Sequence, residues 1–506
     1  MADHSQDNKR IAKNTLMLYI RMILIILVTF YSFRILLEQL GDTGYGTYNA
    51  VAGVIILFGF LSGAMRTATQ RYLSYYLGKK DNEMLQKVFS MSINIHLLIC
   101  GVLLLLAETV GLWFLNTYMQ FPVGLKGEAN ILYQVSIISF LIQILTVPYQ
   151  AVIISHEKMS FYAYFSILEV MLKLSAVLIL MAFTAYKLVI YGIAILVVSA
   201  IVWIVYKIYC IRLFHTYRYT YEPDKNLFKE LISFSGWNMM GGIGTVAASQ
   251  GINIMFNVFC GVVVNAAMGI ANQVGSAVST FVNNFQTAFT PQLIKSYANG
   301  ETDYLYSLVF RASRFSFLLI FLLGFPLIVY CPVVLGIWLG QIPPYAVAFT
   351  RLMIVYCMLE ALSGPLWTTV QASGHIRNYM IIISILIISN LPAGLIFLIK
   401  GMSPVWVIGY KAAASLLILI YRLVYLTKVF DFPIKRYLRI VSMRILLFTA
   451  LCIPFPLLVD YDDRSLWMQI LMIGSCACEI AIVGAFVMLT SSERKFFIDK
   501  LLRRQH

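Results

Sequence analysis

Residues 14–33 read NTLMLYIRMILIILVTFYSF, a mostly apolar run that a single charged residue, Arg21, interrupts. An α-helix of about 20 predominantly apolar residues is long enough to cross the hydrocarbon core of a bilayer. A guanidinium at depth in such a helix costs about 2.5 kcal/mol or more. The stretch therefore predicts a membrane-spanning helix in which Arg21 must have a compensating partner.

The composition of the whole chain is that of a polytopic membrane protein. Of the 506 residues, 60% are hydrophobic and 12% are charged, whereas roughly 25% of residues are charged in a soluble domain. Apolar stretches of spanning length recur throughout and predict an all-α fold with about fourteen transmembrane helices. The predicted spans are 14–37, 47–73, 88–115, 130–153, 161–184, 188–209, 230–257, 264–290, 306–332, 345–370, 378–399, 404–427, 437–459 and 466–489.

Lysine and arginine are distributed unequally between the two sides of the predicted spans. One side carries most of them, and the other carries only Lys126, Lys187, Lys400 and Arg464. Because flanking cations resist translocation, the richer side is expected to be cytoplasmic and to hold both termini. The net charge of +15 arises mostly from this bias, so it does not indicate a nucleic-acid partner.

A basic, aromatic-rich segment, YCIRLFHTYRYTYEPDKNLFKE at 209–230, follows the sixth predicted span. Six spans on each side of it would have the same orientation, which is typical of transporters built from two parallel repeats with the substrate site between them. We therefore predict an N-terminal lobe at 1–209, a cytoplasmic linker at 210–229, a C-terminal lobe at 230–430, and a part at 431–506 with two further spans and a basic cytoplasmic tail.

Charged residues inside the predicted spans are mostly cations. Arg21, Arg66 and Lys173 lie deep in their spans, and Lys173 is four residues after Glu169, close enough to pair with it on one helix face. We expect a translocated anion to supply the missing counter-charge for Arg21 and Arg66, the alternative being carboxylates on other helices.

Cations near the ends of spans are expected to extend toward the headgroups instead. Arg71, Lys411 and Arg422 belong to this group.

Uncharged polar residues follow one face of two successive predicted spans. Such faces either line a hydrophilic cavity or hydrogen-bond one helix to another, and the number of amides favours a cavity. The face of the seventh span includes Asn238, Ser249 and Asn253, and that of the eighth consists of Asn272, Ser276, Ser279, Asn283 and Gln286 at spacings of 4, 3, 4 and 3.

Sequence motifs for catalysis are missing. The chain has no GxxxxGK[ST], HExxH or GxSxG motif and no histidine cluster with the spacing of metal ligands. We therefore expect a carrier rather than an enzyme, with no cofactor and no metal. Its energy would come from an ion gradient, the membrane potential or product consumption, and Glu169 and Glu360 are candidate ion or proton sites.

Four stretches carry a resemblance to a known family: KNTLMLYIRM at 13–22, LEQLGDTGYGTYNAVAGV at 37–54, RYLSYYLGKKD at 71–81 and ISFSGWNMMGGIG at 232–244. Together with fourteen spans and two inside termini, they resemble the Wzx-type oligosaccharide flippases, also called polysaccharide biosynthesis proteins. These belong to the MOP superfamily with the lipid II flippases and the MATE exporters. The resemblance implies transport of an undecaprenyl-pyrophosphate-linked oligosaccharide from the cytoplasmic to the periplasmic leaflet of the bacterial inner membrane, by alternating access, for O-antigen or capsule synthesis.

The resemblance also implies a binding site. In relatives, cations on the first two helices and on the second lobe line a central cavity for the pyrophosphate. Arg21 and Arg66 occupy comparable places, Lys173 is a further candidate, and Arg311 and Arg314 in the ninth span are the second-lobe candidates. The expected partners are the lipid-linked oligosaccharide, membrane lipids and a polysaccharide polymerase or chain-length regulator.

Two alternatives stay open at this point. One is a cation-coupled multidrug exporter of the same fold, although the first predicted span lacks the carboxylate that such exporters use. The other is a membrane glycosyltransferase or O-antigen ligase, which short loops on the translocated side disfavour.

Overall fold

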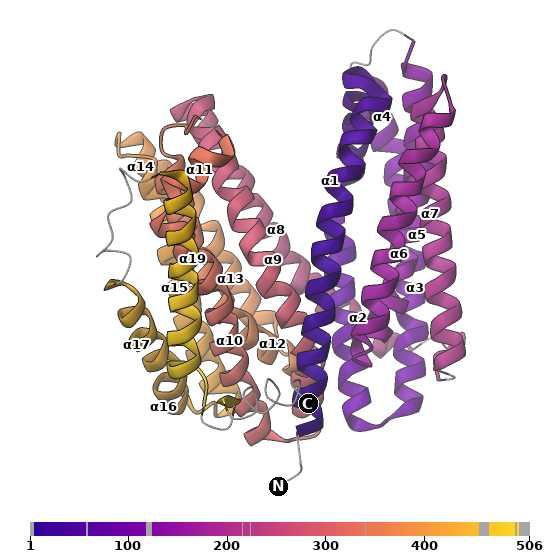
Figure 1. Ribbon diagram of the computed structural model, residues 1–506. Helices are drawn as coiled ribbons and strands as arrows, with labels where there is room; N and C mark the ends of the chain where they lie inside the picture. The colour runs from indigo at the N-terminus through magenta and orange to yellow at the C-terminus, as the bar shows by residue number, and fades with distance from the viewer. Residues whose placement is uncertain are drawn as a thin grey trace, which may run out of the picture. The chain divides into compact units, whose positions relative to one another are not determined.

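The computed structural model describes residues 5–56, 59–117, 124–214, 216–222, 224–339, 341–454, 465–490 and 493–494. All regular secondary structure in these ranges is helical (Figure 1). The last twelve residues of the predicted basic tail and the end of the predicted span 437–459 lie outside the described residues. Contacts divide the chain into two compact units, Met1–Gly242 with Ile294–Asn299, and Ile243–Leu293 with Gly300–His506.

Ten helices within the described ranges are long and apolar enough to cross a membrane. The expectation of an all-α, multi-pass membrane protein is therefore confirmed, whereas the number fourteen stays a prediction, as does the division into four parts. Helices α2 (Gly59–Lys79) and α9 (Val262–Ala298) are long enough but are not among the ten. Their cations and amides lower their hydropathy, and each of the two helices lines a separate polar cavity, α2 in the first unit and α9 in the second.

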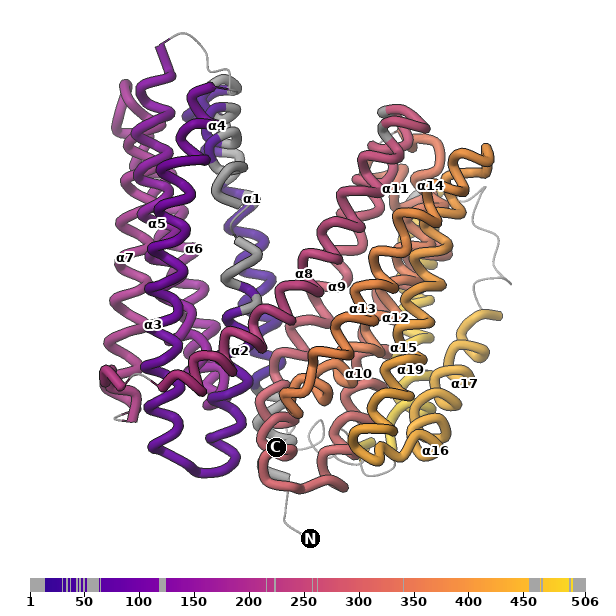
Figure 2. Tube along the Cα trace, turned by 180° about the vertical axis from the view of Figure 1, so that it is seen from behind, coloured from indigo at the N-terminus to yellow at the C-terminus, as the bar shows by residue number. Residues whose placement is uncertain are grey.

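The first unit is a bundle arranged around one buried helix. Its elements are α1 (Ser5–Ile56), α2, α3 (Asn82–Leu106), a π turn (Ala107–Gly111), α4 (Leu112–Thr117), α5 (Lys126–Ser155), α6 (Met159–Ile179), a 3₁₀ turn (Leu180–Ala182), α7 (Lys187–Leu213) and the start of α8 (Lys225–Cys260). Helix α5 packs along α7 and also contacts α1, α2, α3 and α6, as Figures 1 and 2 show from opposite sides.

A glycine interrupts α1 where the sequence predicts the loop between the first two spans. Gly41 has φ +66° and ψ 172°, which is not helical. A residue with a Cβ rarely adopts a positive φ, so glycine permits the chain to turn here.

Helix α3 begins with an N-cap, in which the Asp81 side chain accepts a hydrogen bond of 3.0 Å from the backbone N–H of Met84.

The second unit is a bundle arranged around α12. Besides parts of α8 and α9, its elements are α10 (Thr302–Val329), α11 (Cys331–Leu339), α12 (Ala346–Ser373), α13 (Arg377–Ile388), α14 (Asn390–Ile399), α15 (Val405–Phe430), α16 (Ile434–Tyr437), a π turn (Leu438–Ser442), α17 (Met443–Cys452) and α19 (Leu466–Val487). Helix α12 packs between α10 and α15, and α19 packs on α10 and α17.

Proline in α12 creates a hydrogen-bonding requirement that another helix meets. Pro365 has no N–H, so it cannot donate to the carbonyl of Ala361 four residues earlier. The Nε2 of Gln286 in α9 donates to that carbonyl at 2.9 Å and to the Ser316 hydroxyl at 3.1 Å. Gly364 permits this approach, because a Cβ at that position would overlap the Gln286 Oε1.

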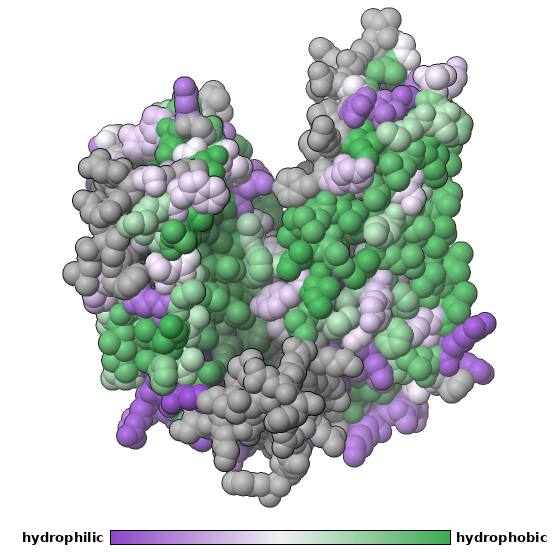
Figure 3. All heavy atoms as spheres, in the orientation of Figure 1, coloured by the Kyte–Doolittle hydropathy of each residue, from purple (hydrophilic) through white to green (hydrophobic). Residues whose placement is uncertain are grey.

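The outer helices present apolar side chains outward, as a lipid-facing surface requires. In α6 only 17% of the most apolar stretch is buried, against 61% in α5. Figure 3 shows the apolar side chains over the middle of the helices of the first unit and hydrophilic ones near the helix ends. This pattern fits a bilayer around the bundle.

Candidate functional site

The first unit contains a polar cavity of about 280 Å³ between five of its helices. Helix α1 contributes Arg21, α2 contributes Arg66, and α5, α6 and α7 contribute the remaining walls. The lining residues are Arg21, Ile25, Arg66, Gln143, Thr146, Gln150, Tyr162, Ser166, Glu169, Val170, Ser199 and Val202. Two cations that are 45 residues apart in sequence therefore share one cavity.

Both arginines in this cavity have unused hydrogen-bonding capacity. The Arg21 guanidinium lies over the ring of Tyr162, with Cζ 4.7 Å from the ring centroid, a cation–π contact that leaves the N–H donors available. The Nε atoms of Arg21 and Arg66 are buried, and neither has a hydrogen-bond partner in the described part of the chain. A buried donor without a partner costs about 1–3 kcal/mol or more, so an anion would be stabilised here.

Helix α5 supplies a neutral polar wall that the sequence analysis missed. Gln143, Thr146 and Gln150 all line the cavity. Their spacings of 3 and 4 residues place them on one helical face, and this pattern is visible in the sequence. Gln143 donates to Ser199 of α7 at 3.4 Å, and Ser199 is 2.7 Å from the Ser139 hydroxyl.

Glu169 and Lys173 form the ion pair that their spacing allows. The Lys173 Nζ lies 2.6 Å from the Glu169 Oε1. Glu169 lines the cavity, and Lys173 is not among the lining residues. Because Lys173 neutralises Glu169, the two arginines leave the cavity with an excess of positive charge.

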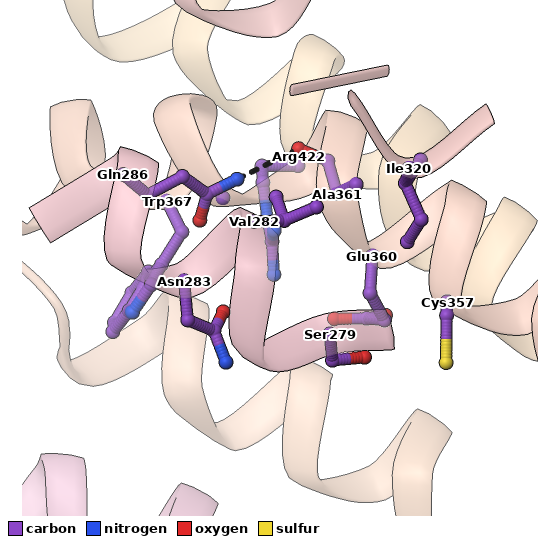
Figure 4. A pocket seen from close by; sticks show the side chains of 11 residues that line it. Ser279, Val282, Asn283, Gln286, Ile320, Cys357, Glu360, Ala361, Trp367 and Arg422 are labelled. Carbon is purple, nitrogen blue, oxygen red and sulfur yellow. Dashed lines mark hydrogen bonds between the residues drawn. The ribbon is translucent and has the colours of Figure 1, made fainter. Parts of the chain in front are cut away.

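The second unit has its own polar cavity, of about 220 Å³, formed by α9, α10, α12 and α15 (Figure 4). Its lining residues are Ser279, Val282, Asn283, Gln286, Ile320, Cys357, Glu360, Ala361, Gly364, Trp367 and Arg422. In Figure 4, Asn283 and Trp367 lie together on one side of this cavity, and Glu360 and Ser279 lie on the other.

The charged residues of the second cavity are bonded to the protein. Arg422 is 7% exposed, and its guanidinium donates from Nε to the Tyr379 hydroxyl and from NH1 to the carbonyl of Ser363. Glu360 accepts a hydrogen bond of 2.6 Å from the Ser415 hydroxyl.

The expectation that cations near span ends extend to the headgroups is wrong for two of them. Arg422 lies in the second cavity, and Arg71 is 6% exposed with its guanidinium over the rings of Tyr72 and Phe234. In both cases aromatic partners inside the bundle replace the headgroups, and Arg422 also donates to the Tyr379 hydroxyl and the Ser363 carbonyl. Lys411 also has an aromatic contact, at 4.4 Å from the Tyr356 ring centroid.

Other residues predicted for the site lie elsewhere. Arg314 is buried and binds the Glu493 carboxylate at 3.1 Å and the carbonyl of Met488. Arg311 lies 3.9 Å from the same carboxylate. Of the polar residues predicted to face a cavity, Ser279, Asn283 and Gln286 line the second one, and those that line neither are Asn238, Ser249, Asn253, Asn272 and Ser276.

Residues 11–297 match the family described as "Polysaccharide biosynthesis protein", and this range is more than half of the 506 residues. The chain belongs to this family. The expected membership of the MOP superfamily is consistent with the match. No curated protein matches the sequence.

Solved structures of MOP-superfamily transporters share the fold. An outward-facing multidrug resistance MATE transporter has a TM-score of 0.72 at 13% identity, covering 83% of this chain and 96% of that chain. A MATE structure in the bent conformation gives a TM-score of 0.69 at 14% identity, with the same coverage of 83% and 96%. A MOP superfamily transporter from Pyrococcus furiosus, described by the reverse polarity of its binding pocket, gives a TM-score of 0.71 at 14% identity. The alignment covers 83% of this chain and 96% of that chain. Family and fold together identify a multi-pass membrane protein of the polysaccharide biosynthesis family with the fold of the MATE transporters.

Proposed function

We propose that this transporter is a flippase for an undecaprenyl-pyrophosphate-linked oligosaccharide, which it moves from the cytoplasmic to the periplasmic leaflet of the bacterial inner membrane. The observation that carries the proposal is the first cavity, in which Arg21 and Arg66 each have a buried Nε donor without a partner among the described residues. The family supports a role in polysaccharide synthesis, and the fold supports transport.

A diphosphate suits the first cavity in charge and in geometry. A guanidinium is planar, stays charged and donates two parallel N–H bonds to phosphate oxygens. Each such charge-assisted bond contributes about 1.5–3 kcal/mol. The neutral amide of Gln150 lines the same cavity and can donate to further oxygens.

The remaining cations receive other roles in this proposal. Lys173 neutralises Glu169. Arg311 and Arg314 hold the segment after α19 through Glu493, so we assign them to the structure of the second unit instead of to substrate binding.

The test is a leaflet assay on the purified full chain in proteoliposomes, with a fluorescent undecaprenyl-pyrophosphate oligosaccharide. Arg21→Ala and Arg66→Ala should each lower the rate about tenfold to a hundredfold, which corresponds to one lost bond of about 1.5–3 kcal/mol. Arg212→Ala is the matched control, because Arg212 is an exposed cation in the last turn of α7 and outside the cavity. Wild-type rates in both cavity variants, at equal reconstitution, would refute the mechanism.

The assay also addresses the energy source. Proton, sodium and potential gradients are imposed in turn, and Glu169→Gln and Glu360→Gln then identify which candidate carboxylate responds.

A polysaccharide polymerase or chain-length regulator is the expected protein partner, and crosslinking in cells is the direct measurement.

The rival function is export of cationic drugs, since one structural relative is a multidrug resistance MATE family transporter. Glu169 is the carboxylate of the first cavity, and it is already paired with Lys173, so the cavity does not attract a cation. Drug resistance that depends on Glu169, together with no movement of the lipid-linked sugar, would favour this rival.

A further inference from the structure

We propose that the second cavity is a carbohydrate subsite that binds one neutral, hydroxyl-rich sugar ring. This inference rests on the proposed function, since it names the part of the substrate that the second unit binds. Three features of the cavity support it: charged residues that cancel each other, neutral groups without a protein partner, and a small volume.

The two charged residues that line the second cavity present no net charge to an ionic ligand. Arg422 is buried and donates to Tyr379 and Ser363, and Glu360 accepts from Ser415. The two residues also have opposite charges, so their sum is zero. A phosphate or a cation would therefore find no uncompensated counter-charge, in contrast to the first cavity with Arg21 and Arg66.

Two neutral residues of this cavity are available to bind a ligand. Neither the Asn283 side chain nor the Trp367 indole N–H forms a hydrogen bond with another described residue. The two residues line the cavity side by side (Figure 4). Asn283 offers two donors and one acceptor, and Trp367 offers one donor. Stacking on Tyr379, at 5.1 Å between centroids and 16° between planes, fixes the orientation of the Trp367 ring.

This combination matches the chemistry of a sugar. A pyranose has hydroxyls around its edge, each both donor and acceptor, and C–H groups on its faces. An amide and a carboxylate that lines the cavity pair with hydroxyls, and a tryptophan provides an apolar surface with a polar N–H at its edge. Asn283, Trp367 and Glu360 supply these three functions in one cavity.

The volume of the cavity limits the size of the ligand. About 220 Å³ is less than the roughly 300–1,000 Å³ of pockets that enclose drug-sized ligands. A single ring is therefore the appropriate occupant. The Gln286 amide, bonded to Ala361 and Ser316, forms a fixed wall of the cavity.

The test uses the purified full chain and free saccharides, so that it does not depend on a diphosphate or on transport. A panel of neutral hexoses, N-acetylhexosamines and uronic acids is screened by saturation-transfer NMR in the millimolar range. At least one neutral saccharide should bind wild type, and Asn283→Ala should weaken binding about fivefold, the effect of one neutral hydrogen bond. Trp367→Leu should abolish it. Asn283 is exposed, so its variant keeps the test valid if Trp367→Leu does not fold.

Arg21→Ala separates this inference from the proposed function. It should keep saccharide binding and lose inorganic pyrophosphate binding. Saccharide binding without any flipping would refute the flippase and leave the subsite standing. No saccharide signal, a signal unchanged in Asn283→Ala, or pyrophosphate binding that requires Trp367 would overturn the subsite.

Discussion

At the scale of single residues, buried polar groups that hydrogen-bond to one another hold the walls of the second cavity in place. Gln286 replaces the backbone donor that Pro365 removes, and in doing so it forms a wall of the second cavity. A buried carbonyl without a donor costs about 1–3 kcal/mol. The stability of α12 therefore depends on a side chain from α9.

Gln286→Leu should lower the free energy of unfolding by about 1–3 kcal/mol, because the Ala361 carbonyl loses its donor. The measurement is the thermal midpoint of purified protein in detergent. Adding Pro365→Ala should restore part of the loss, since alanine supplies the N–H that proline lacks. Equal destabilisation with and without Pro365→Ala would show that the Gln286 bond to Ala361 has no such role.

At the scale of elements, the turn between α5 and α6 connects distant parts of the first unit. Glu157 in this turn has φ +58°, its side chain is fully buried, and it pairs with Lys295 near the end of α9 at 2.7 Å. Its carbonyl accepts a hydrogen bond from the Asn14 amide at 3.2 Å. One short turn thus joins the start of α1, α5, α6 and the end of α9.

Lys295→Gln should destabilise the protein, because it removes the positive charge of Lys295 from the buried Glu157 carboxylate. Breaking a buried pair costs about 3–5 kcal/mol, and we expect the low end since Lys295 is 21% exposed. Lys87 and Glu83 form the control pair, in which the Glu83 side chain is 78% exposed. Glu83→Gln should cost about 0–1 kcal/mol, and a similar loss in both variants by thermal melting would contradict the prediction.

The same turn predicts a pH dependence of stability. Burial, followed by the positive charges of Lys295 and Lys158, lowers the pKa of His156 to about 4 from the usual 6.5. His156 also lies 2.8 Å from the Tyr217 hydroxyl and stacks on Phe214. Above pH 6.5, His156 is neutral in both the folded and the unfolded state, so the folded protein keeps the full stability that this buried neutral imidazole contributes.

As the pH falls from about 6.5 to 4, the unfolded chain binds a proton at His156 more readily than the folded protein, so stability decreases. Below pH 4 the loss from this residue is complete. His156→Gln should flatten the slope of the thermal midpoint in that interval. An unchanged slope would show that His156 does not titrate between the two states.

At the scale of the whole molecule, each unit has a buried central helix that contains proline. These are α5 with Pro148 and α12 with Pro365, and each of them lines the cavity of its unit. The two cavities differ in chemistry, since the first has uncommitted cations and the second has neutral groups.

The predicted topology places Lys80 in the cytoplasm and Lys400 on the opposite side, because nine predicted spans lie between them. Both residues are exposed in short turns. In Lys80→Cys a membrane-impermeant maleimide should label the protein only after the cells are opened, whereas Lys400→Cys should be labelled in intact cells. Labelling of both in intact cells would contradict the topology.

Much of this organisation could be predicted from the sequence, because the bilayer demands about 20 apolar residues for each span. The predicted spans 161–184 and 404–427 correspond to Met159–Ile179 and Val405–Phe430. The cavity positions of Arg21, Arg66 and Asn283 also follow from polar residues in apolar helices. Arg422 was missed, because distance from a span end does not indicate which aromatic and carbonyl partners another helix brings.

The uncommitted guanidinium groups of the first cavity have a practical consequence for anyone who purifies this protein. Phosphate, sulfate and citrate present the same oxygens that Arg21 and Arg66 are suited to bind. Buffers that contain these anions would occupy the cavity, raise the apparent thermal stability by mass action and compete with the lipid. Chloride or zwitterionic buffers are therefore the appropriate medium for binding studies.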